Sequence, residues 1–190
     1  MKKIIIISMS VLISVLIGIR IHHVNSSGTD VPIYVYEKKE EVVFDKFYFS
    51  RNKEATDGYS INVLDTTQIK TNDFLEKYNI NDEIDLSYAD YICIVHAKIK
   101  NVSNDYEDRA GININRFILQ NGAYIGFYNS EIYPNLNKHP DTQFSLAKGV
   151  EIDIYIPFAL KNDDIKMDDF NSGNSYFIIS LYPNKRMVKL

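Results

Sequence analysis

The chain has one cysteine and no tryptophan among its 190 residues. A single thiol, that of Cys93, cannot form an intramolecular disulfide, so the fold must be held together by packing. A chain of this length buries a sufficient hydrophobic core without disulfides or a structural metal. We therefore expect a domain that folds without either.

The sequence also lacks an excess of basic residues. Lysine and arginine number 21 and aspartate and glutamate 25, which gives a net charge of −4 and a pI of about 5.6. Because proteins neutralise nucleic-acid phosphates with a basic face, we expect no nucleic-acid partner.

Short catalytic motifs are missing as well. The sequence has no G-x-S-x-G, H-E-x-x-H, P-loop or dinucleotide-binding fingerprint. The acidic stretches 82–85 and 163–169 lack the spacing of a calcium-binding loop. The adjacent His22 and His23 could supply only two ligands, whereas a zinc site in a protein needs three or four, so we expect no zinc site there. We predict no catalytic residue, no cofactor and no metal site, and hence no enzyme.

The most informative positive signal lies at the N-terminus. Lys2 and Lys3 precede an uncharged, largely apolar run of sixteen residues from Ile4 to Ile19, and Arg20 follows it. A basic stretch followed by an apolar one is typical of a secretory signal peptide or a signal anchor. The positive-inside bias then keeps Lys2 and Lys3 in the cytoplasm and exports the rest of the chain.

Length and cleavage chemistry decide between a retained and a cleaved segment. The apolar run falls just short of the roughly 17 residues that a membrane-spanning helix needs. The nearest candidate for a small-x-small cleavage site is Val24-Asn25-Ser26, which begins with a bulky residue. We favour a retained anchor over residues 1–21, with cleavage and secretion as the alternative. A polar tether is expected over residues 22–41, with an edge strand near Tyr34.

Beyond the tether, apolar and polar residues alternate with the period of a β-strand. In the central segment 91–102, this alternation places Cys93 on the core side and His96 on the opposite face. Segment 150–158 alternates in the same way, and Pro157 near its end indicates an edge strand or a strand exit. The expected strands are 42–49, 59–69, 91–102, 112–120, 123–128, 150–158, 175–182 and 187–190.

Two local signals complete the fold prediction. Residues 71–78 predict one short helix, with Thr71 or Asn72 as its N-cap and Phe74 on its buried face. The dipeptide Asn121-Gly122 indicates a β-hairpin with a type I′ turn. Short strands separated by turns predict an all-β fold, an antiparallel β-sandwich over residues 42–190.

Several stretches together carry a resemblance to a known family. They are DGYSINV with the DFLEKY that follows it, KIKNVS, FILQNG and SLAKGVEIDIYIPF. Their order resembles the immunoglobulin-like extracellular domains of Gram-positive bacteria that are related to the telokin-like, immunoprotective-antigen-like family. Many of those relatives have Pro-Gly where this chain has Lys148-Gly149. The resemblance covers residues 42–190 and implies an immunoglobulin-like sandwich outside the membrane, with no catalytic residue to carry over.

Aromatic and amide side chains gather between residues 124 and 139. Tyrosine and asparagine on loops are typical of surfaces that recognise proteins or carbohydrates. The alternative is that these rings cover the core of the sandwich or lie singly on strand surfaces. The predicted binding residues are Tyr124, Phe127, Tyr128, Tyr133, Asn135 and His139.

These observations predict a non-enzymatic extracytoplasmic binding module, membrane-anchored or secreted, that recognises a protein or a cell-envelope component. A second hypothesis is a small cell-envelope hydrolase with a loop-assembled site, in which His96 or His139 would meet carboxylates in a pocket. A third is a structural or immunity-type protein that shields a neighbour in the envelope.

Overall fold

The computed structural model describes residues 13–21, 31–44, 55–80, 84–105, 111–138, 141–163, 165, 170–181 and 183–190. The chain divides into two units, Met1–Val31 and Pro32–Leu190. In the first unit, residues 13–21 are helical, and residues 1–12 lie outside the described part. Among the described residues, no helix is both long enough and apolar enough to span a bilayer. The membrane anchor therefore stays a prediction.

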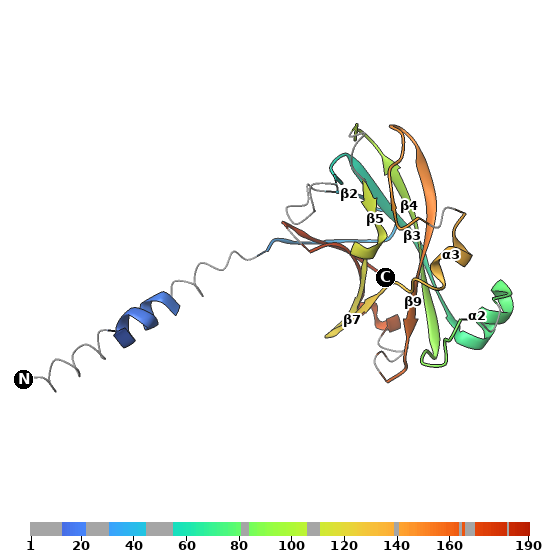
Figure 1. Cartoon of the computed structure of the whole chain (residues 1–190), viewed down its shortest axis with the longest axis horizontal. Helices are drawn as coiled ribbons and strands as arrows, with labels where there is room; N and C mark the ends of the chain where they lie inside the picture. Colours follow the sequence, from blue (N-terminus) through green and yellow to red (C-terminus); the bar gives the residue numbers. More distant parts are fainter. Residues whose placement is uncertain are drawn as a thin grey trace, which may run out of the picture. The chain divides into compact units, whose positions relative to one another are not determined.

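The second unit consists mainly of β-strands, which form three sheets within the described residues (Figure 1). The five-stranded sheet has the order β1-β11-β10-β6-β7, with the bounds Ile33–Tyr36, Lys185–Lys189, Ser175–Ser180, Ile118–Asn121 and Tyr124–Phe127. The four-stranded sheet has the order β2-β3-β4-β9, with the bounds Glu41–Val43, Tyr59–Lys70, Tyr91–Asn101 and Glu151–Leu160. Strands β5 (Ile112–Asn113) and β8 (Gln143–Phe144) form a small third sheet.

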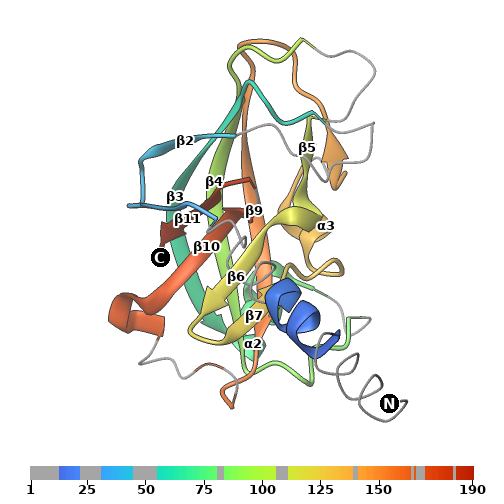
Figure 2. The same cartoon turned by 90° about the vertical axis from the view of Figure 1, so that its left-hand side faces the viewer.

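The two larger sheets face each other across one core. In Figure 2, β10 and β6 pass in front of β3, β4 and β9. Buried side chains from both sheets belong to a single cluster, which we call the main core. The rings of Phe158 on β9 and Phe177 on β10 meet edge to face within it, with their centroids 6.3 Å apart. This architecture is mostly β-sheet and is compatible with a β-sandwich.

The alternation predicted for the central strand is confirmed. On β4, Cys93 and Val95 are fully buried in the main core, and His96 lies on the other face, partly exposed. Near its start β4 is also buried on that other face, because Ile92 and Ile94 belong to a second cluster with Phe74. Strand β9 is the last strand of its sheet, which confirms the edge position indicated by its proline.

Helix α2 has the predicted bounds, Thr71–Tyr78, but a different N-terminus. Its N-cap is Lys70, and no side chain caps it. The Thr71 hydroxyl instead donates to the carbonyl oxygen of Ala89 at 2.7 Å, which ties the helix to the loop before β4. A second short helix, α3 (Tyr133–Leu136), was not expected, because Pro134 and Pro140 indicated a surface loop, but Pro134 lies in the first turn of this helix, where proline is tolerated.

The β6–β7 hairpin forms at the predicted place but in a different register. Asn121 pairs with Tyr124, so Gly122 and Ala123 are the two loop residues. Of these, Gly122 has a positive φ of 54° and Ala123 does not. A glycine with positive φ at the first loop position fits a type II′ turn rather than the type I′ turn expected with Asn121 in the loop.

One further expectation about the strands is wrong. The segment 112–120 is not one strand, because a 3₁₀ helix, η1 (Ile114–Arg116), interrupts it; the side chain of Asn113 accepts from the backbone N–H of Asn115. Within residues 42–190 the described strand pairs are antiparallel, as expected. The edge strand expected near Tyr34 is β1, which lies before this range and runs parallel to β11. The tether predicted for residues 22–41 overlaps β1 and the start of β2, and the end of the strand predicted for 42–49 lies outside the described residues.

Buried amides join the loops at one end of the four-stranded sheet. Asn101, which is 1 % exposed, donates through Nδ2 to the carbonyl oxygens of Asn104 (2.9 Å) and Leu146 (2.7 Å). Its Oδ1 accepts from the backbone N–H of Asn104. Asn104 in turn donates to the carbonyl oxygens of Ala55 and Asp57. Asn101 of the KIKNVS stretch therefore has a structural role, since it ties these loops to the end of β4.

Candidate functional site

The predicted binding residues are spread over several surfaces. Phe127 is 67 % exposed, whereas Tyr124 and Tyr128 are partly buried against the main core. Tyr133 is 1 % exposed, and its ring meets that of Tyr128 edge to face at 5.6 Å. Asn135 is exposed on α3. His139 lies outside the described residues.

These positions follow from local structure. Alternation along β7 turns Tyr124 and Gly126 toward the main core and Ile125 and Phe127 away from it. Burial, followed by the nearby Tyr128 and Asp141, raises the pKa of Tyr133 to about 12. Tyr133 is therefore a core residue rather than a surface contact.

The outer face of the five-stranded sheet carries an apolar row. The strand registers place five apolar side chains side by side across all five strands. We call them the outer apolar row: Val35, Met187, Ile178, Ile118 and Phe127. Its two ends are exposed, Val35 by 53 % and Phe127 by 67 %, whereas Ile178 and Ile118 are buried and Met187 is half-buried. Exposed Ile33 and Ile125 lie on the same face next to the two ends.

A hydrogen bond spans the middle of this face. The Lys185 ammonium donates to Oε1 of Gln120 at 2.8 Å. Because β10 lies between the strands that hold these residues, the bond passes over β10. The exposed apolar area is therefore concentrated at β1 and β7, the two edges of the sheet.

A second candidate surface is the free edge of β9. The Asn137 side chain donates through Nδ2 to the carbonyl oxygen of Tyr155 at 2.8 Å and accepts from its backbone N–H at 2.9 Å. The same Nδ2 also donates to the carbonyl oxygen of Tyr133. One amide side chain therefore makes the two hydrogen bonds that a neighbouring strand would make at this position.

A groove of about 450 Å³ follows this edge. One wall is β9 from Glu151 to Tyr155, and the other is the segment from Leu136 to Lys138 at the end of α3. Among the described residues, the groove lining includes no serine, threonine, cysteine or histidine. The described walls therefore lack the hydroxyl or thiol of a serine, threonine or cysteine nucleophile.

Charged and aromatic side chains lie beside the groove on the outer face of β4 and β9. His96 Nε2 is 2.9 Å from Asp153 Oδ1, and the His96 ring stacks on Tyr155 with centroids 4.4 Å apart. Lys98 donates to Glu151 at 3.1 Å, and this hydrogen bond and charge raise the pKa of Lys98. The pairs are partly exposed and resemble ordinary cross-strand ion pairs.

The Cys93 thiol is unsuited to chemistry. It is fully buried, and burial raises the pKa of this thiol far above its usual range, although the charge of Lys38 lowers it. A reactive cysteine needs an accessible, electropositive environment. In addition, the described residues contain no group of three or more acidic, histidine or cysteine side chains that could hold a metal ion.

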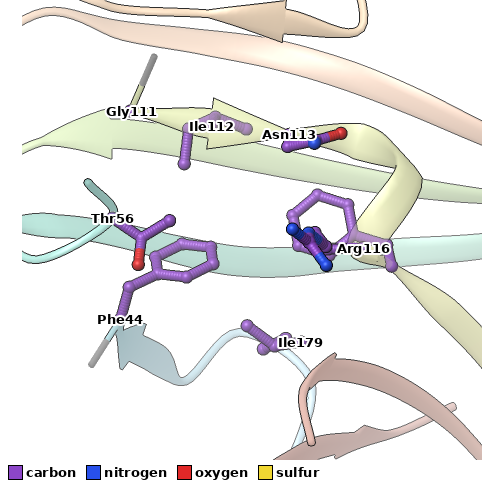
Figure 3. Close-up of a pocket in the computed structure, with 8 residues that line it drawn as sticks. Phe44, Thr56, Gly111, Ile112, Asn113, Arg116 and Ile179 are labelled. Atoms are coloured by element: carbon purple, nitrogen blue, oxygen red, sulfur yellow. The ribbon is translucent and has the colours of Figure 1, made fainter. Parts of the chain in front are cut away.

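A small cavity lies in the core near β5 (Figure 3). Phe44 and Thr56 face Ile112 across it, with Arg116 at one end. Its volume of about 10 Å³ is at the lower limit for one water molecule. It is a packing gap and too small for a ligand.

Comparison with protein families identifies the domain. The family described as Domain of unknown function (DUF5028) matches residues 33–186, most of the chain. The chain belongs to this family. Comparisons with curated proteins and with solved structures give no match. The DUF5028 match begins with β1 and ends in β11, the strands that pair in parallel at one edge of the five-stranded sheet.

Sequence reasoning missed two features of this DUF5028 domain. The partner of His96 is Asp153, 57 residues away, and only the β4–β9 register brings them together. The second missed feature is the pair of hydrogen bonds between the Asn137 side chain and the backbone of Tyr155 on β9. Asn137 lies in a segment whose prolines indicated a loop, and no sequence pattern predicted these bonds.

Proposed function

We propose that this DUF5028 protein is a non-enzymatic extracytoplasmic binding module of a Gram-positive bacterium. Residues 1–21 would anchor it in the membrane, or would be cleaved on secretion. The basic-then-apolar pattern of the N-terminus supports export. Two facing sheets with a shared core support an immunoglobulin-like sandwich related to the telokin-like, immunoprotective-antigen-like family.

The observation that carries the binding role is the exposed end of the outer apolar row. Phe127 and Ile125 are adjacent apolar side chains of an edge strand, both more than half exposed. Single exposed apolar residues are common, but grouped ones on a sheet face mark contact surfaces. The ligand at this face is a protein or another envelope component with an apolar contact area.

The alternative is a small cell-envelope hydrolase. His96 and Asp153 supply a histidine–carboxylate pair next to the groove, which is the observation in its favour. Hydrolysis by this pair would also need a nucleophile or a metal-bound water. The described groove lining supplies no serine, threonine or cysteine nucleophile, and recognition is therefore the better supported function.

Site-specific crosslinking tests the binding role. A photoreactive p-benzoylphenylalanine replaces Phe127 in the full-length chain, expressed in a Gram-positive host. A matched chain carries it at Val102, which is also exposed but lies beyond the end of β4. We expect a discrete crosslinked product from position 127 and none of the same size from position 102.

Competition makes this result specific. Excess unlabelled wild-type protein should suppress the crosslink from position 127, whereas a Phe127→Ser protein should not. Equal suppression by both proteins, or the same product from position 102, would contradict binding through this face.

A further inference from the structure

Strand β9 lies at the edge of its sheet, and the backbone groups along this edge are hydrogen-bonded near the end of the strand but have no described partner near its start. Pairing between β4 and β9 is regular over its whole length. In an antiparallel ladder, the backbone groups of every second residue point away from the partner strand. On β9 these residues include Pro157, whose carbonyl accepts from Asn129 N–H at 2.7 Å, and Tyr155, which the Asn137 amide caps.

Asp153 and Glu151 are the next residues that point outward. No described residue forms a hydrogen bond to their backbone N–H or C=O groups. Four backbone groups on these two residues are therefore open toward the described part of the chain, and the groove runs beside them. An open row of this kind is what peptides use when they add a strand to a sheet.

The side chains at this edge define the charge of an occupant. Glu151 and Asp153 have half-exposed carboxylates, and their ion-pair or hydrogen-bond partners among the described residues, Lys98 and His96, lie on β4. An ionised carboxylate can accept about four hydrogen bonds. Both can therefore accept more from a strand on the open side. Opposite charges directly across a strand pair are favourable, which selects lysine or arginine at those positions.

The residue between two such basic residues would point to the other face of the sheet. Ile152 lies there and is half-buried in the lining of the groove. An apolar side chain suits that position. The partner sequence is thus basic, apolar, basic.

We propose that the edge of β9 binds an extended peptide of this alternating basic and apolar kind as an added antiparallel strand at Glu151 and Asp153. Antiparallel pairing continues the pattern of the four-stranded sheet. A second copy of this chain is a poor occupant, because two antiparallel β9 edges would bring their carboxylates together. This site is separate from the outer apolar row.

Binding of a fluorescent acetyl-KVKVK-amide peptide to the full-length protein in mild detergent tests the proposal. Fluorescence anisotropy should show saturable binding. Methylating the lysine backbone nitrogens should weaken binding at least tenfold, because in antiparallel pairing those N–H groups face β9. Methylating the valine nitrogens should change affinity much less, and an acetyl-EVEVE-amide peptide should bind at least tenfold more weakly.

A protein variant provides the matching test. Asp153→Pro removes one open N–H at a position equivalent to the natural Pro157 in the same strand. It should weaken peptide binding at least tenfold, while Asp163→Asn, which removes an exposed carboxylate elsewhere, should not. Circular dichroism checks the fold, and if Asp153→Pro is unfolded, the two methylated peptides decide the question on the wild-type protein.

Three results would overturn the proposal. One is equal binding of the two methylated peptides, and another is equal binding of the acidic and basic peptides. The third is self-association of the wild-type protein in analytical ultracentrifugation that a folded Asp153→Pro variant abolishes, since the occupant would then be a second copy.

Discussion

Cys93 and His96 lie on opposite faces of the same strand. Cys93 is fully enclosed in the main core, whereas His96 stacks on Tyr155 on the outer face of the four-stranded sheet. Because successive side chains of a strand alternate, the two residues cannot form a Cys–His pair. Their substitution effects should therefore be independent and of very different size.

Enlarging Cys93 should destabilise the fold. Cys93→Leu adds volume to a closely packed site and should cost about 1–3 kcal/mol in the free energy of unfolding. Cys93→Ala should cost less, since the thiol is small. Urea denaturation of the full-length variants measures both effects. Rapid labelling of the native thiol by a maleimide would show that Cys93 is exposed and would contradict this placement.

Removing His96 should have little effect on stability. His96→Ala deletes a partly exposed hydrogen bond with Asp153, and surface changes of this kind usually lie within about 0.5 kcal/mol. The same urea titration measures the change. A loss of more than about 2 kcal/mol would mean that the pair is a structural element rather than a surface contact.

Asn101 should be one of the polar side chains that matter most for stability. Asn101→Ala would leave the carbonyl oxygens of Asn104 and Leu146 without this donor in a buried environment. Each buried group left unsatisfied costs about 1–3 kcal/mol, so we expect a total of about 2–4 kcal/mol. Asn135→Ala on the exposed surface of α3 is the control and should change stability by less than about 0.5 kcal/mol.

Tyr133 should make the domain sensitive to alkaline pH. Its pKa rises from 10.0 to about 12 on folding, so the folded state holds the proton more tightly than the unfolded state. This contribution is complete below about pH 10 and is lost as pH rises from 10 through 12. Tyr133→Phe removes it, so the variant should lose less stability than the wild type over that window. Parallel stability curves of the two proteins would contradict this prediction.

Much of the fold could be predicted because its signals are local. Helix α2 and the alternation of β4 and β9 follow from residues within one element. The edge strand expected near Tyr34 is β1, but its parallel pairing could not be predicted, because that pairing depends on β11, about 150 residues away. The turn type at Gly122 was also missed, since the register of the β6–β7 pair decides which residues form the loop.

The candidate surfaces were harder to predict for the same reason. Phe127 was among the binding residues predicted from composition, but the outer apolar row exists only through the pairing of five strands. Tyr133 was misplaced, because sequence composition does not distinguish a ring on a loop from a ring that packs into the core. The open edge at Asp153 arises because the Asn137 side chain bonds the backbone of Tyr155 and does not reach Asp153, which is two residues earlier.

The register of β9 decides which residues face the core, which face solvent and which backbone groups are open. Amide hydrogen exchange of the full-length protein, resolved by NMR, tests it most directly. We predict slow exchange at Ile152 and Ile154, which bond to β4, protection of Tyr155 by Asn137, and fast exchange at Asp153. Protection of Asp153 equal to that of Ile152 and Ile154 would contradict the account.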